Sequence, residues 1–216
     1  MKNTVKFVFI VFAVTAMLSG CLGKQRSPVK IDYYTLEYAL NKFQDLKTIP
    51  FVLYIERFSV APVYNSNNII YKTRQFKRNA YNYHKWRANP GDLITSFLSR
   101  DLKNSSLFKA VFEPGSRFSS THIISGTVDE FFEQDEKHSW TAILTVSITL
   151  IKANETDISK RIIFQKRYKT SEKCRRKNPR AIAEAMSKAM AGISEMIITD
   201  VYKSLAVNGL EFKIKN

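Results

Sequence analysis

The chain has 216 residues, which corresponds to about one domain at ~100–200 residues per domain. A hydrophobic content of 44%, with seven Gly and six Pro, excludes a collagen-like chain or a wholly disordered one. The 34 Lys and Arg outnumber the 19 Asp and Glu, so the net charge is +15. Such a charge favours an acidic partner, whether a nucleic acid, an anionic membrane or an acidic protein surface.

The N-terminal segment has the pattern of a secretory signal. Residues 1–6 carry two positive charges and no negative one, and residues 7–17 are an unbroken run of apolar or small residues. This run fits the ~7–15 residues of a signal-peptide core and falls short of the ~20 that a membrane-spanning helix needs. Because Lys24 and Gln25 follow soon after it, we predict a signal peptide over residues 1–20 rather than a transmembrane anchor.

The end of this signal resembles a bacterial lipobox, with Leu18, Ser19 and Gly20 before Cys21. Small residues let the backbone extend into a peptidase cleft, and the Cys21 thiol would take a diacylglycerol thioether. Cleavage before Cys21 would free an amine for a further acyl chain such as palmitate. Stable anchoring takes more than one chain, so this lipidation would hold the protein permanently on a membrane. Leucine at position 22, in place of aspartate, implies sorting to the outer membrane.

The mature chain is predicted to have two parts. Residues 21–29 read as a lipidated tether and residues 30–216 as a single domain. The second cysteine, Cys174, cannot form a disulfide with a lipidated Cys21. It lies among Lys and Arg residues, which could lower the pKa of its thiol, but we interpret it as a tolerated thiol in a basic loop.

Alternating hydrophobicity predicts several strands. They are expected over residues 31–36, 51–60, 69–71, 75–77, 108–112, 121–132, 140–152 and 161–168. The clearest is 140–152, where Ala142, Leu144, Val146, Ile148 and Leu150 point to one face. Short polar turns join the last three strands, so they are predicted to form an antiparallel meander. Residues 69–71 and 75–77 are predicted to form a hairpin.

Two helices are predicted from matching start signals, Asn89-Pro90 and Asn178-Pro179, with Asn as the N-cap and Pro at the first helical position. The second helix carries a long apolar stripe, made of Ile182, Ala185, Met186, Ala189, Ile193, Met196, Ile197 and Val201. Asn208-Gly209 is expected to end it, and residues 210–214 to add an edge strand. The order of elements predicts an α+β fold in which a mostly antiparallel sheet has two main helices packed on one face.

Catalytic signatures are missing from the sequence: it has no phosphate-binding glycine loop, nucleophile elbow, HExxH or CxxC. His84, His122 and His138 have no second ligand at metal-binding spacing and read as surface or sheet histidines. Five acids cluster in the order Asp129, Glu130, Glu133, Asp135 and Glu136. They could serve acid–base chemistry or bind Ca²⁺, but no glycine forms a cation loop, so we interpret them as a solvated strand end. The prediction is a protein that is not an enzyme and has no metal or cofactor.

The positive charge is concentrated in two bands. Residues 57–91 hold seven Lys and Arg with no acid, and residues 160–180 hold ten with one acid. The first band also contains aromatic residues, a mixture that suits single-stranded nucleic acid in a cytosolic protein. Because the export signal argues against nucleic acid, the bands favour an anionic lipid surface or an acidic partner, with plain solvated faces as the alternative.

An ordered set of features resembles the ABC-type transport auxiliary lipoprotein family, which accompanies Mce-domain lipid transporters. The matching segments are the lipobox, residues 33–36 (YYTL), 51–62, 69–71 (IIY) and 86–90 (WRANP), followed by Leu98, Leu102, Phe108 and Val111. The basic bands are not part of this pattern.

The resemblance implies a non-catalytic lipoprotein on the periplasmic face of the outer membrane. It would dock an Mce-domain protein that is served by an inner-membrane permease and ATPase, and that moves phospholipid or other hydrophobic cargo. An alternative is a structural or assembly lipoprotein that supports an outer-membrane barrel or lipopolysaccharide export. The sequence leaves open whether the protein is a homo-oligomer.

Overall fold

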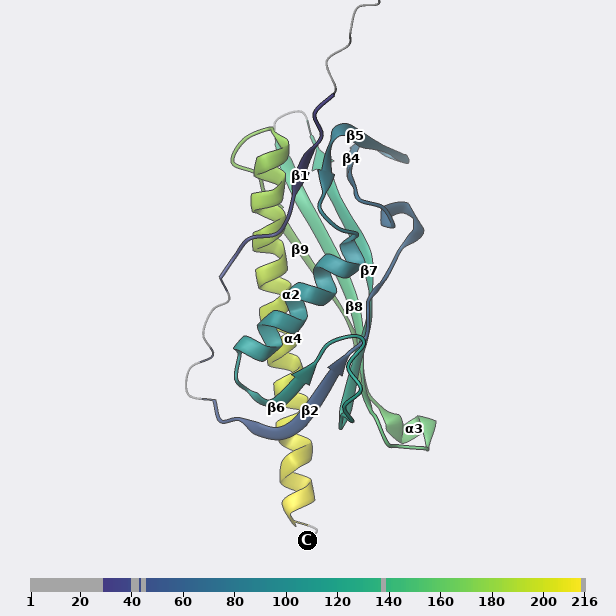
Figure 1. The fold of residues 1–216 in the computed structure, drawn as a ribbon, viewed down its shortest axis with the longest axis vertical. Coiled ribbons are helices and arrows are strands. Elements are labelled where there is room, and N and C mark those ends of the chain that lie inside the picture. The colour runs from purple at the N-terminus through teal and green to yellow at the C-terminus, as the bar shows by residue number, and fades with distance from the viewer. Residues whose placement is uncertain (1–28, 40–42, 44–45, 137–138, 215–216) are drawn as a thin grey trace, which may run out of the picture. The chain divides into compact units, whose positions relative to one another are not determined.

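The computed structural model describes residues 29–39, 43, 46–136 and 139–214, and a compact unit spans Ile31–Asn216. Its fold is α+β (Figure 1). The strands are β1 (Asp32–Tyr34), β2 (Ile49–Ile55), β3 (Ser59–Val60), β4 (Asn68–Arg74), β5 (Lys77–Trp86), β6 (Phe108–Phe112), β7 (His122–Asp135), β8 (Trp140–Lys152) and β9 (Ile162–Lys173). The helices are the 3₁₀ turn η2 (Pro62–Tyr64), α2 (Pro90–Asn104), α3 (Ile158–Arg161) and α4 (Pro179–Ile214).

Strand β7 is the centre of the sheet. One of its edges pairs along nearly its whole length with β8, which in turn pairs with β9, and both pairings are antiparallel. The other edge is shared in succession by β2, β3 and β4, all parallel to β7. Strand β6 extends the sheet beyond β2, while β5 and then β1 extend it beyond β4. The sheet therefore branches on one side of β7 into two short arms.

The expectation of a mostly antiparallel sheet is wrong, because the sheet is mixed. Five strand pairings are parallel and three are antiparallel. The predicted hairpin and the predicted meander are both antiparallel, as expected. The parallel pairings arise because the chain crosses over repeatedly to reach the same edge of β7, rather than turning back on itself. The predicted strand over residues 51–60 is also divided, into β2 and β3.

Both predicted helix starts are confirmed. The side chain of Asn89 accepts a hydrogen bond from the Gly91 N–H at 2.9 Å, and Asn178 accepts one from the Ala181 N–H at 2.9 Å. The predicted end of the second helix is wrong, since α4 continues through residues 208–209 to Ile214. One glycine costs a helix only about 1 kcal/mol, so it does not by itself end one. The edge strand expected over residues 210–214 is therefore helical.

The core lies between the sheet and the two long helices, which Figure 1 shows on the same face. Helix α4 packs on β8 and β9, α2 packs on β6 and β7, and the helices contact each other. The five inward positions predicted on β8 are all at most 1% exposed. Each large side chain buried there contributes about 1.5–3 kcal/mol. From the predicted helical stripe, however, Met196 lies outside the core and is 38% exposed.

One carboxylate is buried between α2 and the segment after β1. Asp101 is fully buried and accepts a hydrogen bond from the Tyr38 hydroxyl at 2.6 Å and two from Arg100 at 2.7 and 2.9 Å. The Arg100 guanidinium lies 4.5 Å from the ring centres of both Tyr38 and Phe97. Burial raises the pKa of Tyr38, and its hydrogen bond to Asp101 raises it further.

Replacing Tyr38 with phenylalanine is expected to lower the free energy of unfolding by about 2 kcal/mol, because Asp101 then loses a donor that water cannot replace. Urea unfolding followed by circular dichroism measures this difference. Tyr83→Phe serves as the control, since Tyr83 is 52% exposed and its loss should be silent. Equal effects of the two variants would contradict the role given to the buried hydrogen bond.

Candidate functional site

The lipobox predicted from the sequence, Leu18, Ser19, Gly20 and Cys21, lies outside the described residues. Lipidation of Cys21 therefore stays a prediction. Among the helices in the part of the chain that the structure describes, none has the length and apolar character needed to cross a membrane.

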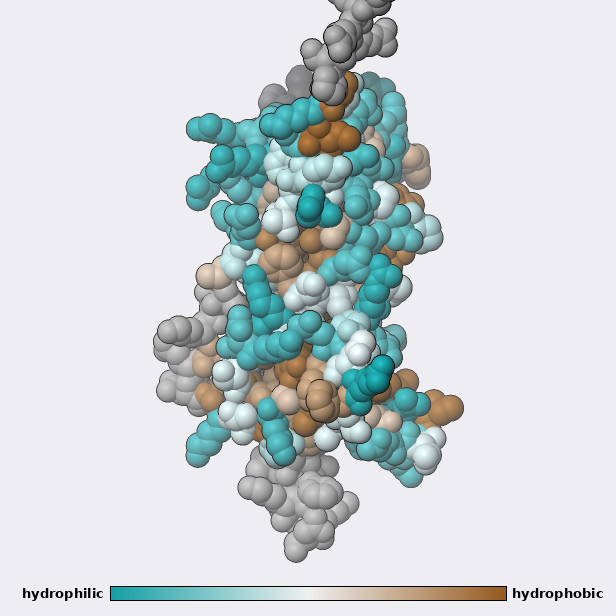
Figure 2. Space-filling view, in the orientation of Figure 1, coloured by the Kyte–Doolittle hydropathy of each residue, from teal (hydrophilic) through white to brown (hydrophobic). Residues whose placement is uncertain are grey.

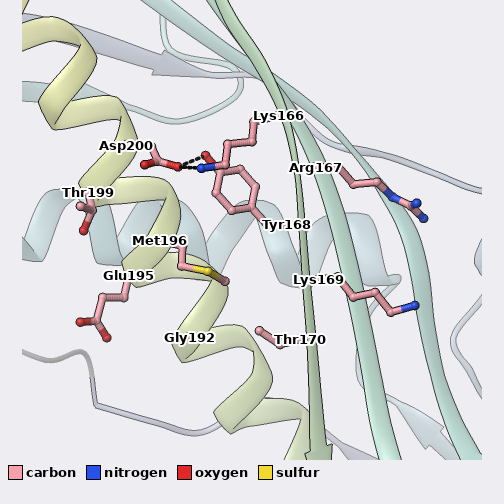
Figure 3. Close-up of a pocket in the computed structure, with 10 residues that line it drawn as sticks. All are labelled: Lys166, Arg167, Tyr168, Lys169, Thr170, Gly192, Glu195, Met196, Thr199 and Asp200. Carbon is pink, nitrogen blue, oxygen red and sulfur yellow. Dashed lines mark hydrogen bonds and ion pairs between the residues drawn. The ribbon is translucent and has the colours of Figure 1, made fainter.

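A surface groove runs between the last strand and the last helix (Figure 3), and we call it the β9–α4 groove. It has a volume of about 690 Å³. Its principal lining residues are Lys166, Tyr168 and Thr170 from β9 and Gly192, Met196 and Asp200 from α4. Alternation along β9 turns the even-numbered side chains toward α4 and the odd-numbered ones toward the outer face of the sheet.

The polar end of this groove is held by Asp200. It accepts hydrogen bonds from the Lys166 ammonium at 2.6 Å and the Tyr168 hydroxyl at 2.8 Å, as Figure 3 shows. Burial by itself would raise the pKa of Asp200, but these two donors outweigh it and the pKa is lowered. All three groups are engaged with one another, so the arrangement suits a fixed wall rather than proton transfer.

The other end of the groove is lined by Gly192, Glu195 and Met196. Met196 is 38% exposed there, and Gly192 contributes no side chain. A Cβ placed on Gly192 would meet nothing nearer than the Thr170 methyl at 3.8 Å. This end can therefore accept a side chain from another molecule.

Strand β9 also forms an edge of the sheet. Among the described strands it pairs with β8 and no other, so the backbone groups on its far side are not used within the sheet. An extended segment can add to such an edge through backbone hydrogen bonds, with its side chains in neighbouring pockets. Lys166, Arg167, Lys169 and Lys173 make this edge strongly basic, which discourages pairing between copies of it.

The five clustered acids are divided by a bulge in β7 between Val128 and Glu130. Asp129 and Glu130 lie on the outer face, where Arg167 contacts Asp129 at 3.2 Å and Lys169 contacts Glu130 at 3.1 Å. Asp135 pairs with Lys177 at 3.7 Å. No group of three or more metal ligands forms among the residues that the structure describes. The cluster is thus neither one Ca²⁺ site nor one solvated strand end.

Glu133, which we expected to be solvated, is fully buried. The Tyr81 hydroxyl lies 2.9 and 3.2 Å from its two carboxylate oxygens. Burial raises the pKa of Glu133 to about 7, although the hydrogen bond from Tyr81 lowers it in part. Burial also raises the pKa of the Cys174 thiol to about 11. The nearby cations therefore do not lower the pKa of this thiol, and its interpretation as a tolerated thiol stays a prediction.

His84 and His122 lie in strands β5 and β7, as expected of sheet histidines. His84 lies 3.7 Å from Asp32 and 3.3 Å from the Tyr34 hydroxyl. His122 is buried at the start of β7, where burial and Lys152 lower its pKa to about 4. His138 is outside the described residues.

The two basic bands meet at one end of the sheet. Lys72, Gln134, Thr141 and Lys173 lie level on the neighbouring strands β4, β7, β8 and β9. The turn between β4 and β5 and the loop before α4 therefore project from the same end. We call this the basic end; its cations are Arg74, Lys77, Arg78, Lys173, Arg175, Arg176, Lys177 and Arg180. Figure 2 shows hydrophilic side chains gathered there, around the start of α4.

The turn between β4 and β5 carries an exposed aromatic ring. Arg74 pairs with Lys77, so Gln75 and Phe76 form a two-residue turn. Phe76 is 93% exposed and has a φ of 60°, in the left-handed region that favours glycine or asparagine. The left-handed backbone of a phenylalanine costs about 1–2 kcal/mol of conformational energy, and packing of the Phe76 ring within the compact unit does not offset this cost. Such a residue at a turn points to a contact outside the chain.

Sequence reasoning missed both of these surfaces. The groove depends on β9 being an edge, which strand alternation alone does not reveal. The predicted hairpin placed residues 75–77 in a strand, which is wrong, because Gln75 and Phe76 form the turn and the strands run to Arg74 and from Lys77. The composition offered a signal, a large aromatic residue between basic residues. The two basic bands of the sequence contain the residues of the basic end, but the sequence does not show that the bands meet in space.

With this architecture, the chain belongs to a family of lipoproteins. The model of the ABC-type transport auxiliary lipoprotein component matches residues 34–198. This match spans strands β2 to β9 and the first part of the last helix, so the chain is a member of that family. Among curated proteins, no sequence matches it.

Solved structures share the fold. The protein XCC0632 from Xanthomonas campestris is similar with a TM-score of 0.75 at 13% identity, covering 83% of this chain and 99% of that one. An uncharacterized protein has a TM-score of 0.62 at 13% identity, covering 80% and 99%. The hypothetical protein CT253 from Chlamydia trachomatis has a TM-score of 0.52 at 9% identity, covering 74% and 99%. At such identities, these likenesses establish the fold alone.

Proposed function

We propose that this protein is a non-catalytic, outer-membrane-anchored lipoprotein that serves as the accessory subunit of an ABC/Mce-type transport system. Cys21 would carry the lipid and hold the domain at the periplasmic face of the outer membrane. The cargo would be phospholipid or another hydrophobic molecule, carried by an Mce-domain protein with an inner-membrane permease and ATPase. The observation that carries the proposal is the family match over residues 34–198.

The β9–α4 groove is the surface we assign to the transport partner. It combines a free strand edge with the exposed side chain of Met196, which suits an extended segment of another protein. The polar groups of the groove, Asp200, Lys166 and Tyr168, are hydrogen-bonded to one another. This supports a docking role rather than an enzymatic one.

Site-specific crosslinking in the protein's own cells tests the partner and the surface together. A photoreactive amino acid replaces Met196 in the groove, and a matched variant carries it at Ile158 on α3, which is 76% exposed and away from the groove. The crosslinked products are purified and identified by mass spectrometry. We expect an Mce-domain protein to be captured from position 196 and not from position 158.

Two other outcomes are informative. Capture of a barrel protein or a lipopolysaccharide-export factor, with no Mce-domain protein from either position, would overturn the transport proposal and favour an assembly role. Capture of an Mce-domain protein from position 158 alone would keep the transport role and reject the groove as its docking surface. Labelling with radioactive palmitate, lost in the Cys21→Ser variant, tests the lipid anchor separately.

A further inference from the structure

We propose that the basic end of the domain is a membrane-contact surface, in which Phe76 enters the interface of a bilayer and the surrounding cations bind anionic lipid headgroups. The domain would then contact its membrane directly through this end, in addition to being attached through its tether. The inference goes beyond the proposed transport role. One of its arguments, the reach of the tether, rests on the proposed anchor at Cys21.

The charge at this end suits an anionic surface. Its eight Lys and Arg are set against four acids, namely Asp135, Glu136, Glu172 and Glu184. Two of these acids are already paired within the end, Asp135 with Lys177 at 3.7 Å and Glu184 with Arg180 at 3.3 Å. Arg175, Arg176 and Arg180 line one recess at the start of α4. Clustered cations of this kind are attracted to anionic headgroups.

Phe76 decides between a membrane and an acidic protein as the occupant. Its ring is 93% exposed at the very tip of a hairpin, with Arg74 and Lys77 directly beside it. An aromatic ring flanked by cations is the composition that proteins place at the boundary between headgroups and acyl chains. A flat acidic protein surface would offer no apolar layer for a projecting ring of this kind.

The covalent reach of the tether permits this contact. Strand β1 runs parallel to β5, with Asp32 opposite His84, so β1 begins at its end nearer the hairpin tip. His84 follows Lys77 by seven positions, which spans ~23 Å of strand. Ile31 follows Cys21 by ten positions, which can span ~33 Å when extended. A lipid on Cys21 and a ring at Phe76 can therefore occupy the same bilayer.

A vesicle-binding experiment tests the surface without the lipid anchor. The chain from residue 21 onward with Cys21→Ser keeps the whole compact unit, and its flotation is measured with vesicles of phosphatidylethanolamine and phosphatidylglycerol, and with phosphatidylcholine vesicles. We expect binding to the anionic vesicles and not to phosphatidylcholine. The double variant Arg74→Glu/Lys77→Glu should lower the partition coefficient at least ~25-fold, since each cation contributes about a factor of five.

A matched control has the same change of charge at the opposite end of β7. Lys47→Glu/Lys109→Glu alters two exposed lysines. Lys47 precedes β2 and Lys109 lies in β6, next to the pairing of Ile49 with Phe108. This variant should bind within about twofold of the parent chain, because its lysines lie far from the surface. Circular dichroism establishes that both double variants are folded. Equal losses in the two variants, or no binding of the parent chain, would overturn the proposal.

The position of the ring is tested in the anchored protein. Lipidated full-length protein carrying Phe76→Trp is reconstituted in anionic vesicles that contain brominated acyl chains, which quench nearby tryptophan. Phe118→Trp is the control, because Phe118 is 72% exposed and stacks on Phe112, level with the start of β7. We expect quenching at position 76 and none at 118.

The outcomes separate this inference from the proposed function. Equal quenching at the two positions would overturn the membrane contact, as would an unquenched tryptophan at position 76. Neither result would affect capture of an Mce-domain protein from position 196. Conversely, failure of that capture leaves the vesicle experiments unchanged, since they need no partner protein.

Discussion

Gly126→Ala is expected to lower the free energy of unfolding by about 3 kcal/mol, measured by urea unfolding. A Cβ at this position would lie 2.5 Å from Cε2 of Phe58 and 2.8 Å from the backbone oxygen of Ser147. Neither neighbour can withdraw easily. The Ser147 oxygen belongs to the paired strand β8, and Phe58 is buried, with its N–H bonded to the Thr95 hydroxyl at 2.9 Å.

Gly192→Ala is the matched control. Gly192 is in α4, where the nearest atom to a new Cβ is 3.8 Å away, so alanine should raise the free energy of unfolding by about 0.5–1 kcal/mol. The clash at Gly126 can also be relieved directly, because Phe58→Leu replaces the ring with a shorter side chain. The double variant Gly126→Ala/Phe58→Leu should therefore recover part of the free energy of unfolding that Gly126→Ala loses. Equal effects at the two glycines would refute the close-contact explanation.

Glu133→Gln is expected to stabilise the protein at pH 8 by about 3 kcal/mol. Burial raises the pKa of Glu133 in the folded protein from 4.5 to about 7. Between these values the folded state holds a proton that the unfolded state releases. The stability that this group contributes is therefore fully present below about pH 4.5 and is lost as the pH rises through about 7. The amide stays neutral and can still accept the hydrogen bond from Tyr81.

The measurement is the free energy of unfolding in urea at several values between pH 4 and pH 8. The parent chain should lose stability across this window relative to Glu133→Gln, whose curve should be flatter. Glu56→Gln is the control, because Glu56 is exposed and its replacement should leave the slope of the parent unchanged. A parent chain that gains stability over the same window relative to Glu133→Gln would disprove the raised pKa.

Local patterns in the sequence predicted much of the fold. The two helix starts followed from Asn-Pro pairs, whose effect is confined to one turn. The strand over residues 140–152 followed from alternation that is uninterrupted in β8. These features depend on neighbours along the chain, so they are visible without the partner strands.

The features that were missed depend on distant contacts. Nothing near β2, β3 or β4 indicates that all three lie along one edge of β7, so their parallel pairing was not predicted. The bulge after Val128 reverses the alternation in β7, which brings Phe131 and Glu133 inward. Alternation continued from Ile124 and Val128 would place Glu133 on the outer face, so the sequence gives no sign of its burial. Met196 looked like core because its helical spacing fits, but β9 ends the sheet before reaching it.

The shared edge of β7 has a consequence for the order in which the chain folds. Strands β2, β3 and β4 all pair with residues 122–135. The pairs β1–β5, β4–β5 and β2–β6 can form earlier, but they cannot join into one sheet until that strand has appeared. The meander of β7, β8 and β9 is local and can form early, whereas the N-terminal strands must close long loops to reach it, which slows folding. A chain that emerges from its N-terminus would thus expose its apolar first half longest, and we expect it to depend on a holding chaperone until β7 follows.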